Sequence, residues 1–163
     1  TVTAIILNGW NPVTPDLIVP GTTQKSNVFY YMPNVTTQAG FEQTRAIAAF
    51  LAERYDGSNP DYGKVSNWII GNEVNNYNTY NYAGSQTLRQ YSQIYADQFR
   101  LAYNTLVSVY SNARVYISLD HLWNTNYVNG TFASRKCWIL LLQRYVPVEI
   151  CNGTLHITHT VLH

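Results

Sequence analysis

Short apolar segments alternate with long amphipathic ones along this chain, and this alternation constrains its fold more than any other feature. The first apolar segment, residues 2–7, is rich in β-branched side chains, ends at Asn8-Gly9 and is too short for a typical helix. Residues 68–71 and 115–119 form two similar segments. All three are apolar on both faces, which is typical of strands in a parallel sheet covered by helices.

Helical patterns fill the two intervals between the predicted strands. Residues 37–55 carry apolar side chains on one stripe with a period of 3.6, widened by Ile47 and Phe50, and residues 56–60 (DGSNP) end this helix. The loop before it contains four prolines between residues 12 and 33, so we expect no helix to cross that loop.

The second helical pattern runs from about Ser85 to Tyr110, and its stripe places Tyr91 and Tyr95 in the core. Strand–helix–strand–helix–strand predicts an α/β fold, either doubly wound or a barrel. A doubly wound nucleotide-binding domain is disfavoured because no glycine-rich phosphate turn follows any of the strands.

Composition excludes several classes of protein. Ten Lys and Arg balance nine Asp and Glu, and charged residues make up only 12% of the chain, which argues against a nucleic-acid or anionic-membrane surface. No apolar run has the roughly 18 residues that a membrane span needs, and Thr1 to Asn8 do not form a signal peptide. The compartment therefore stays open, with a secreted or cell-surface parent protein as one option.

Asn72 and Glu73 come directly after the second predicted strand, at the end of a parallel sheet where ligands bind. Glu73 can serve as general acid and base on a glycosidic oxygen, and the Asn72 amide can bind a neighbouring sugar hydroxyl. The alternative is a strand-end Glu that caps the next helix or faces solvent.

Asp120 and His121 follow the third predicted strand and should lie near the same face as Glu73. His121 can bind a sugar hydroxyl or orient Glu73, and Asp120 can hold two hydroxyls. The alternative is a local cap with His121 hydrogen-bonded nearby. The pair does not form a metal site, because no third ligand has suitable spacing.

Aromatic side chains gather in the loops after the predicted strands, where flat rings suit stacking against sugars. The set comprises Trp10, Tyr77, Tyr80, Tyr82 and Trp123, with Asn8, Tyr30 and Tyr31 on the same rim. Packing under the rim is the alternative for each single aromatic. We select Tyr82, Trp123 and Asn8 as candidate substrate contacts.

The segment from Trp68 to Asn75, WIIGNEVN, resembles the strand-4 motif of the clan A glycoside hydrolases, which are (β/α)8 barrels. More closely, the chain resembles a bacterial family of that superfamily whose function is unknown. The matching segments are residues 50–55, 68–75, 81–84 and 114–123. The resemblance covers roughly residues 1–134 and makes the three strands numbers 3 to 5 of a partial barrel.

The resemblance implies a two-carboxylate hydrolysis of O-glycosidic bonds, with Glu73 as acid/base and Asn72 as hydroxyl binder. This chemistry requires no metal or organic cofactor. The nucleophilic carboxylate of that clan lies on strand 7, which has no counterpart here, so we expect the chain alone to be inactive. The alternative function is a non-catalytic carbohydrate-binding barrel.

Residues 135–163 differ in character from the rest of the chain. They contain both cysteines and three of the four histidines, and residues 137–143 show neither a helix cap nor strand alternation. We interpret this tail as translated out of frame, because shifted codons permit the segments that the family has after strand 5. Accordingly, His156, His159 and His163 are not taken as a metal cluster, despite their spacing.

Overall fold

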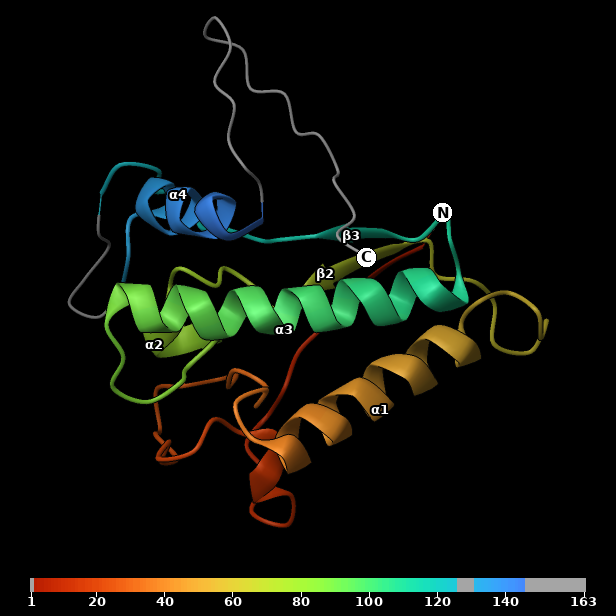
Figure 1. The fold of residues 1–163 in the computed structure, drawn as a ribbon, viewed down its shortest axis with the longest axis horizontal. Coiled ribbons are helices and arrows are strands. Elements are labelled where there is room, and N and C mark those ends of the chain that lie inside the picture. The colour runs from red at the N-terminus through yellow and green to blue at the C-terminus, as the bar shows by residue number, and fades with distance from the viewer. Residues whose placement is uncertain (1, 126–130, 146–163) are drawn as a thin grey trace, which may run out of the picture.

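The computed structural model describes residues 2–125 and 131–145, and the side chains of residues 143–145 are outside that description. Figure 1 shows the path of the chain. In order, its elements are β1 (Thr3–Ile6), the 3₁₀ turn η1 (Pro15–Leu17), α1 (Gln38–Arg54), β2 (Asn67–Ile70), α2 (Tyr77–Tyr80), α3 (Leu88–Val109), β3 (Arg114–Tyr116) and α4 (Ser134–Tyr145).

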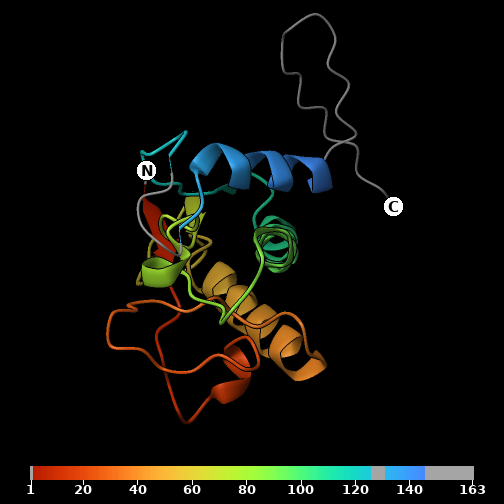
Figure 2. The same cartoon turned by 90° about the vertical axis from the view of Figure 1, so that its left-hand side faces the viewer.

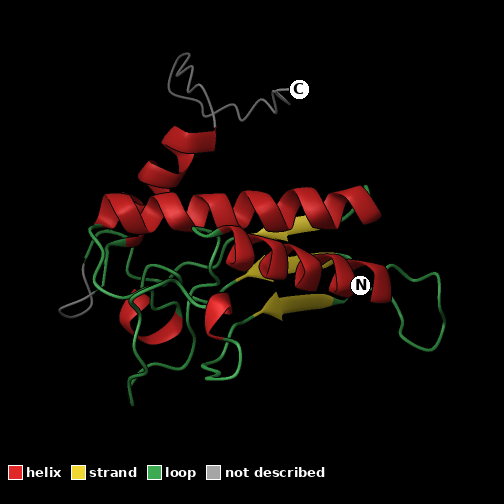
Figure 3. Ribbon diagram, turned by 60° about the horizontal axis from the view of Figure 1, so that its bottom comes forward, coloured by secondary structure: helices red, strands yellow, loops and turns green. Residues whose placement is uncertain are grey.

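The three strands form one parallel sheet in the order β1-β2-β3, and this confirms the predicted α/β class. Thr3 pairs with Asn67 and Asn67 pairs with Arg114, so the strands begin at a common level. The connection from β1 to β2 contains α1, and the connection from β2 to β3 contains α3. Figures 2 and 3 show both helices on the same face of the sheet.

The core between sheet and helices follows the period of two that strands impose on side chains. Trp68 and Ile70 of β2 point to the helices and are buried against Ala52 of α1 and Leu106 of α3. A second core cluster lies around Tyr91 and Tyr95 of α3 and includes Cys137 and Leu141 of α4.

The opposite face of the sheet is open in the described part of the chain. Ile5, Leu7 and Tyr116 are 48%, 38% and 44% exposed, although the sequence predicts strands buried on both faces. The reason is the one-sided placement of the helices: both crossovers return on the same side, so they cover a single face.

Threonine caps precede both long helices: α1 begins next to its predicted start at Thr37, and α3 begins at Leu88, a few residues after the predicted start near Ser85. The Thr37 side chain accepts a hydrogen bond from the Gly40 amide, and Thr87 forms a capping box with Gln90. The apolar stripe of α1 is narrower than predicted, because Ile47 and Phe50 are 43% and 57% exposed. Neither side chain belongs to the core cluster between α1, α3 and the sheet.

The prediction for the proline-rich loop is confirmed, whereas residues 137–143 are helical. The proline-rich loop contains no α-helix, only the turn η1, in which Pro15 starts the helical turn. The loop after β2 contains the single-turn helix α2. Residues 137–143, for which we predicted neither helix nor strand, belong to α4, because Cys137 and Leu141 pack against α3. No helix of the described residues has the length and apolar character to span a membrane.

Candidate functional site

The candidate site lies in the loops that follow the carboxyl ends of β2 and β3. β2 ends at Ile70, and the next residues turn sharply: Gly71 has φ of 76° and Glu73 has φ of 41°. Both angles are in the left-handed region, and Glu73 is the one non-glycine residue of the described chain that adopts it. For a residue with a Cβ, such a conformation costs about 1–2 kcal/mol.

Ser118, which follows β3, holds this turn in place. Its hydroxyl accepts a hydrogen bond from the Glu73 amide (3.2 Å) and donates one to Asn72 Oδ1 (3.4 Å). Its carbonyl oxygen accepts the Val74 amide at 3.0 Å. Sequence reasoning missed Ser118, although a hydroxyl inside an otherwise apolar strand segment was an available signal.

The Asn72 and Glu73 side chains are both partly buried, so each keeps access to solvent. The contact with Ser118 occupies the carbonyl oxygen of the Asn72 amide, which leaves its NH₂ group as a donor. The structure therefore places the two residues together, as predicted, with a carboxylate and an amide donor on one short turn.

Two tyrosines of α3 donate hydrogen bonds to backbone carbonyls of this turn and of the strand before it. The Tyr91 hydroxyl donates to the Val74 carbonyl at 2.5 Å and accepts from Asn81 Nδ2 at 2.7 Å. The Tyr95 hydroxyl donates to the Ile70 carbonyl at 2.6 Å. Burial raises the pKa of Tyr91 well above its usual value of 10.0, so its hydroxyl stays protonated as a donor. The sequence places both rings in the core correctly, but their hydrogen bonds to the loop were not predicted.

Asp120 and His121 lie beside this turn, after β3. His121 Nδ1 is 2.6 Å from Asp120 Oδ1, and the same carboxylate oxygen accepts the Leu122 amide at 3.0 Å. The Asp120 side chain is buried, so the structure favours a local role for this carboxylate over direct binding of two hydroxyls. His121 is exposed and remains available to a ligand.

Asn75 connects the two loops. Its Oδ1 accepts the Asp120 amide at 2.8 Å, and its Nδ2 donates to the Phe132 carbonyl at 3.0 Å. The Ser134 hydroxyl donates to the Asp120 carbonyl at 2.7 Å. Asn75, like Ser118, is a residue that sequence reasoning did not single out.

The aromatic residues of the rim divide into packed and exposed ones. Tyr82 is buried, with an edge contact to Tyr31 and a stacked contact to Tyr77, and Tyr77 itself stacks on Phe132 with centroids 4.8 Å apart. The structure thus supports the packing alternative for Tyr82 and Tyr77. Trp123, in contrast, is 46% exposed beyond β3.

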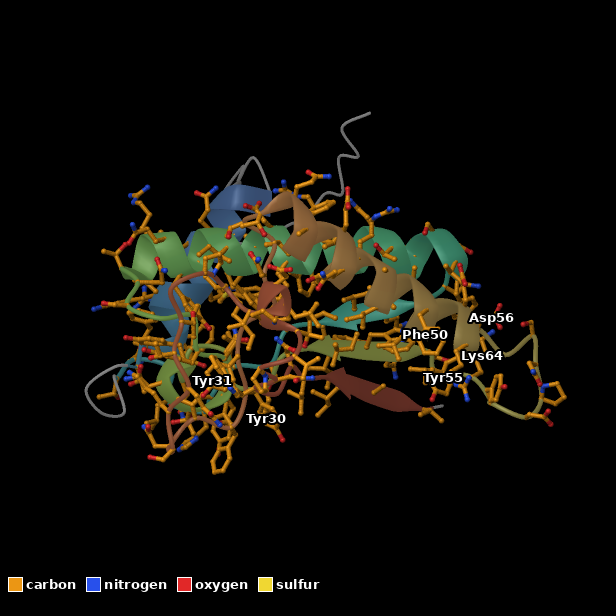
Figure 4. All side chains as sticks on the ribbon, turned by 90° about the horizontal axis from the view of Figure 1, so that it is seen from below. Tyr30, Tyr31, Phe50, Tyr55, Asp56 and Lys64 are labelled. Carbon is orange, nitrogen blue, oxygen red and sulfur yellow. The ribbon has the colours of Figure 1, made fainter. Side chains whose placement is uncertain are left out.

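The remaining rim residues lie along the loop after β1. Trp10 packs against Tyr31, and Tyr80 stacks on the exposed ring of Phe29. Asn8 donates from Nδ2 to the Leu17 carbonyl at 3.0 Å, which gives its amide a structural partner. Figure 4 shows Tyr30 and Tyr31 at one end of the molecule, and Phe50, Tyr55, Asp56 and Lys64 at the other.

Metal-binding groups and a groove are two further features that bear on ligand binding. Across residues 2–125 and 131–145, no three His, Cys, Asp or Glu side chains are grouped as a metal site would need. The predictions for His156, His159 and His163 concern residues outside the described ranges. A groove of about 620 Å³ runs between α1 and α3, lined among others by Arg45, Glu53, Asp97 and Arg100, and includes none of the candidate site residues.

Neither the curated proteins nor the solved structures include a significant match. One family model matches residues 1–149, that of a family of unknown function, DUF5722. Because this match covers most of the sequence, the chain belongs to the DUF5722 family.

Proposed function

We propose that this chain forms part of a carbohydrate-active (β/α)8 barrel that hydrolyses O-glycosidic bonds. In this proposal, Glu73 is the acid/base carboxylate and Asn72 binds a sugar hydroxyl. The three strands correspond to strands 3 to 5 of the barrel, as the resemblance to clan A glycoside hydrolases implies.

The arrangement of the sheet fits a barrel. The strand order is sequential, and both crossover helices lie on one face. A barrel has this order with its helices outside and apolar side chains inside, and one half of a doubly wound sheet has the same order. What disfavours the doubly wound fold is that no glycine-rich phosphate turn follows a strand. The open apolar face with Ile5, Leu7 and Tyr116 fits the inner side of a barrel.

The left-handed backbone of Glu73 is the observation that carries the proposal. Strain of this kind persists only where surrounding contacts enforce it, and it is concentrated at functional sites. Glycine would adopt the same φ without cost, yet the chain has a carboxylate here, held by two hydrogen bonds from its turn to Ser118. A Glu that only faced solvent would not need this conformation.

The chemistry follows from the groups that the turn presents. A protonated Glu73 donates its proton to the glycosidic oxygen as the bond to the anomeric carbon breaks and a second carboxylate of the barrel bonds to that carbon. The Glu73 carboxylate then takes a proton from the water that attacks the anomeric carbon and displaces the second carboxylate. The Asn72 NH₂ group, which forms no hydrogen bond to the described residues, can donate to a sugar hydroxyl.

A specific observation also favours the second candidate, a non-catalytic carbohydrate-binding barrel. Glycosidases need two carboxyl groups about 5–10 Å apart. Of the two acids that closely follow β2 and β3, Asp120 is buried and paired with His121, so Glu73 is the only one that remains accessible. The ends of β2 and β3 therefore supply one reactive carboxylate and not two.

The test compares this chain and the protein encoded by the full open reading frame, each as wild type, Glu73→Gln and Glu53→Gln. Affinity electrophoresis in soluble polysaccharides measures binding, and release of reducing ends measures hydrolysis. Hydrolysis lost only in Glu73→Gln supports the enzyme, and binding without hydrolysis supports the binding barrel. If neither protein binds or cleaves any polysaccharide, the proposed function is refuted. Glu53, an exposed residue of α1 away from the strand ends, is the control.

A further inference from the structure

We propose that Asp120 positions His121 so that its imidazole presents an unprotonated Nε2, which accepts a hydrogen bond from a hydroxyl of the bound carbohydrate. The ligand class in this inference rests on the proposed function, whereas the state of the imidazole does not. Asp120 is then a positioning residue, and His121 is the residue that contacts the ligand.

The contrast in exposure between the two side chains is the first argument. The Asp120 side chain is 5% exposed, while the His121 side chain is 80% exposed, and the atoms that join them are 2.6 Å apart. An ionised carboxylate can only accept hydrogen bonds, so the shared hydrogen belongs to Nδ1 of His121. In a neutral imidazole the other nitrogen, Nε2, then carries a lone pair and no proton.

The anchoring of Asp120 is the second argument. Its amide donates to Asn75 Oδ1, its carbonyl accepts from Ser134, and its Oδ1 accepts the Leu122 amide. The carboxylate is therefore fixed by bonds that do not involve His121. Within residues 2–125 and 131–145, no Lys or Arg forms an ion pair with it. The imidazole therefore adapts its tautomer to the fixed carboxylate rather than the reverse.

An exposed Nε2 that accepts hydrogen bonds favours ligands that carry hydrogen-bond donors. A lone pair recognises hydrogen-bond donors such as hydroxyl groups, and it disfavours carboxylate or phosphate oxygens, which offer no proton. Asn72, on the neighbouring turn, offers an NH₂ donor, and Asn75 joins that turn to the loop of Asp120. A donor and an acceptor from adjacent strand ends match a polyhydroxylated ligand, because each hydroxyl can both donate and accept.

The tautomer can be measured directly in the intact chain. Long-range ¹H–¹⁵N correlation spectra of ¹⁵N-labelled protein at mildly alkaline pH distinguish a protonated Nδ1 from a protonated Nε2. The His121→Phe variant identifies the signals of His121. We expect a protonated Nδ1 in the wild type, loss of that preference in Asp120→Ala, and its retention in Asp120→Asn, whose amide oxygen still accepts. Asp97→Ala, on α3, is the control that leaves the signals unchanged.

A wild-type His121 protonated at Nε2 overturns the inference, and so does a tautomer that Asp120→Ala leaves unchanged. If Asp120→Ala does not fold, the wild-type spectrum alone decides. With any polysaccharide that the chain binds, His121→Phe should weaken binding about tenfold, the equivalent of one hydrogen bond of about 1.4 kcal/mol. Unchanged affinity overturns the role in ligand contact. Absence of all binding refutes the proposed function instead, while the spectrum still tests the positioning by Asp120.

Discussion

Replacing Glu73 tests the strain on which the proposed function depends. The two informative variants are Glu73→Gly and Glu73→Ala, because both remove the carboxylate and they differ only by the Cβ. At φ of 41°, alanine retains the left-handed cost of about 1–2 kcal/mol, and glycine does not. Glycine loses about 0.5–1 kcal/mol through the greater freedom of the unfolded chain. The net expectation is that Glu73→Gly is more stable than Glu73→Ala by about 0.5–1 kcal/mol.

Urea denaturation monitored by tryptophan fluorescence measures this difference, with equal slopes required for the comparison. In a thermal scan the same difference corresponds to roughly 1–4 °C for a chain of this size. The control is the same pair of substitutions at Glu42, inside α1, where helix propensity predicts the opposite order, with alanine about 1 kcal/mol more stable. If alanine is also the more stable residue at position 73, the turn is not strained and the support for a functional Glu73 disappears.

Three further predictions concern the surroundings of the site and its core. Gly71→Ala should lower the free energy of unfolding by about 2–4 kcal/mol, because the added Cβ would lie 2.7 Å from Val74 Cγ1 at a φ of 76°. The control is Gly63→Ala, where the backbone is also left-handed but the space is open, and the loss should be only about 1 kcal/mol. Equal losses for the two variants in urea denaturation would contradict the predicted clash. Tyr91→Phe should cost about 2 kcal/mol in the same assay because two buried partners of its hydroxyl lose their bond, and a loss near zero would show that water replaces it. Burial raises the pKa of Cys137 from 9.0 to about 11, so the folded state holds a proton that the unfolded state releases, and stability should fall as pH rises from 9 to 11, by up to about 3 kcal/mol from this group. Cys137→Ala should flatten that decline in denaturation curves recorded across this pH range, and an unchanged slope would rule out the thiol as its source.

The fold could be predicted where a local pattern determines it. The strands and the two long helices appear in the sequence as apolar runs and a period of 3.6, and Thr37 marks the start of α1. Periodicity cannot show how much of a helix surface its neighbours cover. For this reason the sequence placed Phe50 on the buried stripe of α1, whereas the structure leaves it exposed. Periodicity also cannot show α4, whose residues Cys137 and Leu141 become helical against a surface distant in sequence.

The position of the candidate site could be predicted from the sequence, but its backbone conformation and hydrogen bonds could not. Asn72 and Glu73 could be placed at a strand end because a strand-end motif is local. The left-handed φ of Glu73 depends on Ser118, which is 45 residues away, and Asp120 depends on Asn75 across the same interval. Hydrogen bonds of this span leave no periodic trace in a sequence. The burial of Asp120, which changes it from a candidate ligand contact to a partner of His121, is a property of packing.

The bonds between the two strand-end loops run in both directions, and this explains how the strain at Glu73 is maintained. The turn after β2 donates two amides to Ser118, and the loop after β3 donates the Asp120 amide to Asn75. At about 1 kcal/mol each, the two bonds to Ser118 offset the left-handed cost of about 1–2 kcal/mol. The strained residue therefore needs the neighbouring loop in place, and the Asn75 bond ties that loop back to the same turn. Glu73 and the Asp120–His121 pair are held as one unit, so a substitution that loosens either loop should displace both.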